Sequence, residues 1–132
     1  MKFFILPTFI FLLFLLNPQS SYAEHIDLAP CTKLSHCFLE EWDVSTINEP
    51  LSEIQLLIEN NPRTNIVEMD GDYIHAEVES RLFKFIDDLE VTYLNQKNMI
   101  LIRSESRIGD GDFGVNKNRV KMLKKQLFNL NA

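Results

Sequence analysis

The segment TNIVEMDGDYIHAEVES, residues 64–80, contains two strand-like segments joined by a tight turn, and this pair determines the architecture that the rest of the sequence predicts. Its first segment, residues 64–70, is short and contains several β-branched side chains, and the Asp-Gly pair that ends it is typical of a hairpin turn. In the second segment, residues 72–80, apolar and polar residues alternate as in a half-buried strand. This pattern predicts two antiparallel strands with one face toward a core, and it places His75 on the opposite, polar face.

Two more strand-like segments follow along the chain. They are LFKFIDDLEVTYL at residues 82–94 and NMILIRSES at residues 98–106, and the polar residues between them predict a hairpin loop. Counting by twos places five side chains of the first of these segments on one face: Phe83, Phe85, Leu89, Val91 and Tyr93. Because the connections between neighbouring segments are short, we expect a meander of four antiparallel strands.

Amphipathic helices are predicted on both sides of these strands. In NEPLSEIQLLIENNP, residues 48–62, apolar side chains recur at helical spacing, Asn48 can cap the helix and Pro50 suits its first turn. In the tail, residues 116–132, the apolar stripe consists of Val120, Leu123, Leu127 and Leu130. Residues 48–132 are therefore expected to form a two-layer α+β domain, in which an N-terminal and a C-terminal helix cover one face of a four-stranded antiparallel meander sheet.

Residues 1–23 have the pattern of a secretory signal peptide. Lys2 precedes an apolar run that ends at Leu16, and small residues stand at Ser21 and Ala23. The run is shorter than the roughly 20 apolar residues that span a membrane, which favours cleavage over retention as an anchor. We therefore expect an exported bacterial protein, periplasmic or secreted, with no stable membrane span after cleavage.

Residues 24–47 contain both cysteines of the chain and are expected to form an irregular arm pinned by a disulfide. Cys31 and Cys37 can close a small loop in an oxidising compartment. The alternative is a metal site, because His36 lies beside Cys37, but zinc needs four ligands and the sequence holds no second Cys/His cluster. We expect a structural disulfide, with no metal and no cofactor.

The formal net charge of the chain is −6 at pH 7. Phosphate binding needs a basic surface, so this charge excludes nucleic acid as the partner. It also gives no overall attraction to an anionic membrane, and it favours a soluble monomer.

One acidic residue interrupts the apolar face of the third strand-like segment. Counting by twos places Asp87 on that face, where a carboxylate needs a partner. If the next segment folds back through the polar loop, Asp87 lies between Arg103 and Arg107, and a shift of one residue gives that place to Asp88. Either register predicts an aspartate–arginine network.

This network has a structural and a functional interpretation. In the first, it fixes the strand register and anchors the loop that follows. In the second, the two arginines clamp an anionic ligand with help from Ser104 or Ser106, and one of the aspartates acts as general acid or base. The structural interpretation is favoured, because ion-pair networks where a sheet meets a loop are more often structural than part of a binding or catalytic site.

The glycine-rich segment IGDGDFGVN, residues 108–116, is expected to lead from the last strand into the last helix. Its three glycines permit positive φ, Asp112 can bond backbone groups and Asn116 can cap the helix. Calcium and phosphate sites are alternatives, but the segment lacks the final glutamate of a calcium loop and the Gly-Lys-Ser/Thr of a phosphate loop.

Two motifs resemble the domain of unknown function 1499 family. The family's strand motif Phe-x-Asp-Asp-x-Glu stands here at residues 85–90. Its longer motif, which begins Arg-Ser-Ala-Ser-Arg and ends Asn-x-x-Arg, stands at residues 103–119, with Glu105 in place of the small residue. The resemblance covers residues 31–128 and adds Arg119 to the candidate network, but it implies no activity, because the family is named for lacking a known function.

We expect a non-enzymatic binding or envelope-associated accessory module whose aspartate–arginine network is structural or binds an anion. The alternative is a small hydrolase- or transferase-like enzyme that uses the aspartates with the arginines and a serine. The first is favoured, because the sequence contains no strong nucleophile–base pair and no metal-ligand set. Asp110 and Gly111 stand where the family usually has an aromatic residue and a serine, so a property specific to this chain is expected there first.

Overall fold

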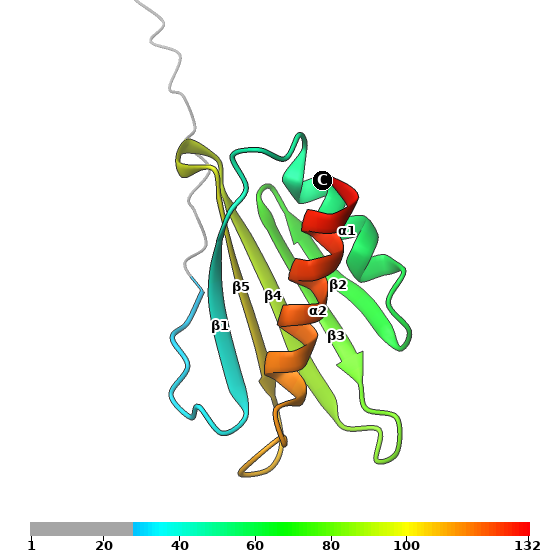
Figure 1. Ribbon diagram of the computed structural model, residues 1–132. Helices are drawn as coiled ribbons and strands as arrows, with labels where there is room; N and C mark the ends of the chain where they lie inside the picture. The colour runs from blue at the N-terminus through cyan, green and yellow to red at the C-terminus, as the bar shows by residue number, and fades with distance from the viewer. Residues whose placement is uncertain (1–27) are drawn as a thin grey trace, which may run out of the picture.

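The computed structural model describes residues 28–132, so the expected signal peptide and the first residues of the expected arm lie outside the described part of the chain. Its elements follow one another as strand, helix, four strands and helix (Figure 1). The strands are β1 (Cys37–Asp43), β2 (Thr64–Asp70), β3 (Tyr73–Glu79), β4 (Ile86–Leu94) and β5 (Met99–Ser106). The helices are α1 (Pro50–Glu59), α2 (Val115–Leu130) and the short 3-10 helix η1 (Asn95–Lys97).

One antiparallel sheet with the strand order β1-β5-β4-β3-β2 forms the first layer, and α1 and α2 pack on one of its faces as the second (Figure 1). This confirms the α+β class, the meander from β2 to β5 and the two helices. Strand alternation explains the arrangement, since Ile74, Ala76 and Val78 of β3 all face the helices and are buried. The largest fully buried side chains of this core include Trp42, Ile54, Ile58, Ile74, Leu89, Ile100, Ile102, Leu123 and Leu127.

The sheet has five strands rather than the expected four, because part of the expected irregular arm forms β1. This strand pairs antiparallel with the edge of β5, with Cys37 opposite Glu105. The sequence pattern hides β1, because the charged Glu40 stands in line with Trp42, whose side chain is buried in the core. A strand in which a carboxylate interrupts the apolar face does not show a clean period of two.

Glu40 is held on this face by two lysines of α2. Lys121 Nζ and Lys124 Nζ donate hydrogen bonds to Glu40 Oε1 at 2.8 and 2.9 Å. Burial alone would raise the pKa of Glu40, but the hydrogen bonds from the lysines outweigh it and lower the pKa to about 2. The two lysines therefore attach the edge strand β1 to the helix layer.

The strand β4 begins at Ile86, later than expected, so Phe83 and Phe85 lie in a loop and not on a strand. Ser80 closes this loop, because its N–H donates to the Phe85 carbonyl at 2.8 Å and its Oγ accepts from Phe85 N at 2.9 Å. The backbone of Lys84 turns within the loop at a φ of 55°. The expectation that both phenylalanines face the core is wrong: their rings stack on each other with centroids 5.5 Å apart and remain exposed.

Both helix starts differ from the expected caps. The residue before α1 is Glu49, with a φ of 54°, and no side chain caps the helix, so Asn48 is not its cap. The residue before α2 is Gly114, with a φ of 79°, and Asn116 lies inside the first turn. At the other end of α2, Leu130 is 65% exposed and leaves the buried stripe. Within residues 28–132, neither helix has the length and apolar character that crossing a membrane requires.

Candidate functional site

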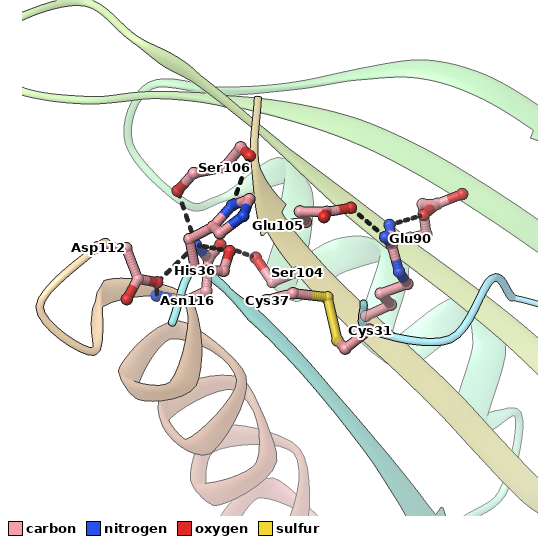
Figure 2. The surroundings of a disulfide bond; sticks show 10 residues. Cys31, His36, Cys37, Glu90, Ser104, Glu105, Ser106, Asp112 and Asn116 are labelled. Atoms are coloured by element: carbon pink, nitrogen blue, oxygen red, sulfur yellow. Dashed lines mark hydrogen bonds and ion pairs between the residues drawn. A yellow bond between two sulfur atoms is a disulfide. The ribbon is translucent and has the colours of Figure 1, made fainter. Parts of the chain in front are cut away.

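Strand alternation divides the serines and arginines of β5 between the two faces of the sheet. Ser104 and Ser106 point toward Asn116 of α2 (Figure 2). Arg103 lies on the far face, where it binds Glu90. β4 pairs with β5 so that Asp87 is opposite Ser106, which is the second of the two expected registers. Asp88, and not Asp87, therefore shares a face with the arginines of β5 and its following loop.

Asp87 lies on the helix side, as expected, but its partner comes from α2. Arg119 Nη2 donates to Asp87 Oδ2 at 2.7 Å, and both side chains are almost buried. The other terminal nitrogen of Arg119, Nη1, donates to Ser104 Oγ at 2.8 Å and to Asn116 Oδ1 at 2.7 Å. The helix therefore supplies the buried cation that strand counting assigned to the neighbouring strand.

Asn116 joins three segments of the chain at the start of α2 (Figure 2). Its buried Nδ2 lies 2.9 Å from Ser106 Oγ, 2.7 Å from Asp112 Oδ2 and 3.1 Å from the carbonyl oxygen of His36. Ser104 Oγ donates to Asn116 Oδ1 at 2.6 Å. Asn116 therefore connects β5, the 107–114 loop and the residue before β1, and it does not cap the helix.

Asp112 is the residue that accepts hydrogen bonds from the backbone at the start of α2. Its Oδ1 accepts from Gly114 N and its Oδ2 from Asn116 N, both at 2.9 Å. Burial would raise the pKa of Asp112, but these backbone hydrogen bonds, with the amide of Asn116, outweigh it and hold the pKa below its ordinary value. Because N–H groups engage both oxygens, the arrangement gives no support to the calcium alternative.

On the far face, Arg107 binds two carboxylates. Its Nε donates to Asp88 Oδ2 at 2.8 Å, and its Nη2 donates to Asp88 Oδ1 and to Glu77 Oε1, both at 2.6 Å. The hydrogen bonds from Arg107 are the main reason that the pKa of Asp88 lies below its ordinary value. His75, on the polar face as expected, places its Nε2 2.7 Å from Asp88 Oδ1.

Arg103 forms a second cluster on the far face. Its Nη1 donates to Glu90 Oε2 at 2.9 Å and its Nη2 donates to Glu105, while Tyr73 donates to Glu90 Oε1 at 2.8 Å. These glutamates were not expected as partners, although alternation places each of them on the polar face of its strand. Since each arginine already binds two carboxylates, Arg103 and Arg107 do not form a clamp around one open position.

The expected disulfide between Cys31 and Cys37 is present. Cys37 is buried at the start of β1, so the bridge fastens the preceding segment to the edge of the sheet (Figure 2). That segment also contacts the loop with the family departure, because Ser35 Oγ donates to the carbonyl of Asp110 at 2.5 Å. Asp110 thus helps to hold two loops together.

The loop at residues 80–85 and the loop at residues 107–114 flank a cavity of about 430 Å³, which we call the aromatic cavity. Its lining includes three aromatic side chains and three residues of the buried network: Phe83, Phe85, Phe113, Asp87, Ser106 and Asp112. The sequence pattern missed this cavity, because it placed the first two phenylalanines in the core.

A second cavity of about 520 Å³ adjoins the first, since Ser80 and Val115 line both. We call it the arginine cavity, because its lining includes Arg63, Arg81 and Arg119. Asp87 lines the aromatic cavity and its partner Arg119 lines the arginine cavity, so the buried ion pair lies between them. Each volume falls within the range of roughly 300–1,000 Å³ that is usual for small-molecule sites.

Neither serine of the motif has the surroundings of a nucleophile. Ser104 is fully buried, and its Oγ bonds the amide of Asn116 and the guanidinium of Arg119. Ser106 Oγ accepts from Asn116 Nδ2, and His36 Nδ1 lies 3.0 Å from the carbonyl oxygen of Ser106 and not from its hydroxyl. In the described part of the chain, therefore, no general base is paired with either hydroxyl.

A comparison of the chain with curated proteins found no match. The family described as Protein of unknown function (DUF1499) matches residues 19–127, which include β4, β5 and the network from Asp87 to Arg119. Since this match spans most of the chain, the protein belongs to the DUF1499 family.

Proposed function

We propose that this protein is an exported, non-enzymatic binding module that holds an amphipathic anion across the two adjoining cavities. The apolar body of the ligand packs against Phe83, Phe85 and Phe113, and its anionic group lies at Arg63 and Arg81. The observation that carries the proposal is that an aromatic cavity and an arginine-lined cavity lie side by side and share Ser80 and Val115 in their walls.

Two of the three arginines retain donors for an anion. Arg63 Nε donates to the carbonyl of Glu79 at 3.2 Å, which leaves its two terminal nitrogens for a ligand. The side chain of Arg81 is exposed, and within residues 28–132 no hydrogen bond or ion pair engages it. Guanidinium groups of this kind bind carboxylate, sulfonate or phosphate oxygens with charge-assisted hydrogen bonds.

The buried network has a structural role in this proposal. Arg119 is committed to Asp87, Ser104 and Asn116, so it holds the wall between the cavities instead of meeting the ligand. The anion clamp expected from Arg103 and Arg107 gains no support, because both are occupied by carboxylates on the far face. The enzymatic alternative gains none either, because its serines lack a base.

Export belongs to the same proposal. The disulfide between Cys31 and Cys37 supports an oxidising compartment, since such bonds persist mainly in exported proteins. The apolar and small-residue pattern of residues 1–23 supports passage out of the cytoplasm. A small ligand of the cell envelope is therefore the class that this module is placed to meet.

Two fluorescent probes test the proposal, because they share an aromatic body and differ in charge. Anilinonaphthalene sulfonate carries an anionic group, whereas phenylnaphthylamine carries none. We expect the sulfonate to bind more tightly, and Phe85→Ser to weaken both probes. We expect Arg81→Gln to weaken only the sulfonate, by about tenfold, which is the value of one charge-assisted hydrogen bond.

Lys125→Gln serves as the matched control, because Lys125 is an exposed cation of α2 that lines neither cavity. Its probe affinities should equal those of the unchanged protein. Thermal melting of every variant separates a lost site from a lost fold. Absence of probe binding to the folded protein, or equal effects of Arg81→Gln and Lys125→Gln, would contradict the proposal.

A further inference from the structure

The loop between β3 and β4 presents an unusual run of exposed residues, Arg81-Leu82-Phe83-Lys84-Phe85. Two of them are cations, three are apolar and none is acidic. Leu82 is 81% exposed and Phe83 is 73% exposed, so water covers most of both side chains. Large apolar side chains gathered in this way mark a surface that meets a partner.

The loop at residues 107–114 adds two more apolar side chains at the same end of the sheet (Figure 1). Phe113 is fully exposed, and Ile108 is largely so. We call the tip the set formed by residues 81–85 with Ile108 and Phe113. Both loops flank the aromatic cavity, and four of the five apolar side chains of the tip line it: Phe83, Phe85, Ile108 and Phe113.

The net charge of −6 hides an uneven distribution of charge between the two ends of the sheet. Arg63, Arg81, Lys84 and Lys117 are exposed at the end that carries the tip, and the exposed Asp110 offsets part of this positive charge. At the opposite end, where Lys97 is an exposed cation, acidic residues follow β1 and surround the turn between β2 and β3: Asp43, Glu49, Asp70 and Asp72. An anionic surface therefore attracts the tip and repels the far end of the molecule.

We propose that the tip docks this protein on a lipid membrane that contains anionic headgroups. Leu82, Phe83 and Phe113 enter the interface, which takes apolar side chains to a depth of about 5–10 Å. Arg81 and Lys84 reach the headgroup phosphates at the ends of their long apolar stems. The apolar side chains project separately from two loops, and a deformable lipid surface suits that shape better than the flat face of a protein.

This docking does not depend on a ligand in the cavities. Leu82 and Lys84 belong to the tip but line neither cavity. The other members of the tip each line one cavity: Arg81, Phe83, Phe85, Ile108 and Phe113. Substitutions at Leu82 and Lys84 therefore test the membrane without disturbing the ligand site. If the protein binds the probes but not the vesicles, only the docking proposal is wrong. If it binds the vesicles but not the probes, only the proposed ligand site is wrong.

Co-sedimentation with vesicles is the direct test. We expect the purified protein to bind vesicles of phosphatidylcholine mixed with phosphatidylglycerol much more tightly than vesicles of phosphatidylcholine alone. Lys84→Glu should weaken binding to the mixed vesicles by tenfold or more, since each charge near an anionic surface contributes about fivefold. Leu82→Ser should weaken it by about tenfold, as expected for partial loss of a buried leucine side chain.

Two matched controls separate docking from general effects of charge and hydrophobicity. Lys125→Glu reverses an exposed charge on α2, and Leu130→Ser removes an exposed leucine from the other end of the molecule. Both should bind vesicles like the unchanged protein. Equal losses in the controls and in the tip variants would overturn the proposal, as would a lack of binding to the mixed vesicles.

A fluorescence reporter distinguishes insertion from simple adsorption. Leu82→Trp places an indole at the tip, while the natural Trp42 is buried in the core and contributes a constant signal. We expect a blue shift of the emission when mixed vesicles are added. An unshifted spectrum in sedimenting protein would contradict insertion, and tip-dependent dimerisation without vesicle binding would identify a second copy of the chain as the partner instead.

Discussion

The two faces of β4 carry ion pairs of the same chemical kind in different surroundings, through Asp87 on one face and Asp88 on the other. On the helix side, Arg119 and Asp87 are 12% and 7% exposed and belong to a network closed by α2. On the far face, Arg107 is 41% exposed, although it makes the more complete, two-pronged contact with Asp88. We therefore expect the access of water, more than the number of hydrogen bonds, to decide how much each ion pair stabilises the fold.

The strongest test of this comparison breaks the helix-side pair. Arg119→Gln leaves the carboxylate of Asp87 buried and unpaired, and we expect the free energy of unfolding to fall by about 3–5 kcal/mol. Urea unfolding followed by circular dichroism measures the change. High salt should not diminish the loss, because ions do not screen a buried pair well.

A double substitution shows whether the unpaired charge causes that loss. Asp87→Leu combined with Arg119→Met replaces the pair by apolar side chains, an exchange that is often close to neutral in buried sites. We expect Ser104 and Asn116 to keep in this variant the hydrogen bond that joins them in the unchanged protein. We expect the double variant to recover most of the stability lost in Arg119→Gln, and a double variant as unstable as the single one would contradict the explanation.

Strand alternation was sufficient to predict the centre of the fold. In residues 72–80 the side-chain period of two follows directly from the extended backbone, so the buried face of β3 could be identified from the letters alone. β1 was not predicted, because Glu40 interrupts its apolar face and because its partner β5 is distant in sequence. From the sequence alone, a glutamate that binds lysines of a distant helix looks the same as a glutamate that is exposed to water.

The candidate site shows the same limit. The need of Asp87 for a partner followed from its position on an apolar face, and that expectation was correct. The identity of the partner was wrong, because counting along strands considers only neighbours in the sheet, and Arg119 comes from a helix packed on it. The aromatic cavity was missed for a related reason, since it depends on how two loops approach each other at one end of the sheet.

The substitution Asn116→Ala tests whether the helix-side residues act as one unit, and its expected effect is smaller. It removes the amide that joins Ser106, Asp112 and the carbonyl of His36. Because buried polar groups lose their partners, we expect the free energy of unfolding to fall by about 2–3 kcal/mol. Asn129→Ala, an exposed site in the last turns of α2, is the matched control and should leave the urea midpoint nearly unchanged.

The smallest effect is expected on the far face, where Arg107→Gln breaks an exposed contact. The variant should lose little stability at neutral pH, and the loss should shrink further in high salt, since the pair is open to solvent. Its dependence on pH has a definite sign. Arg107 lowers the pKa of Asp88 in the folded protein, so this contribution is present above the unfolded pKa of about 3.9 and is lost as the pH falls through the folded pKa. The melting temperatures of Arg107→Gln and of the unchanged protein should therefore differ at pH 7 and become equal in acid. A difference that persists in acid would show that Arg107 stabilises the sheet through the packing of its side chain, and the contrast between the two faces would then not rest on charge.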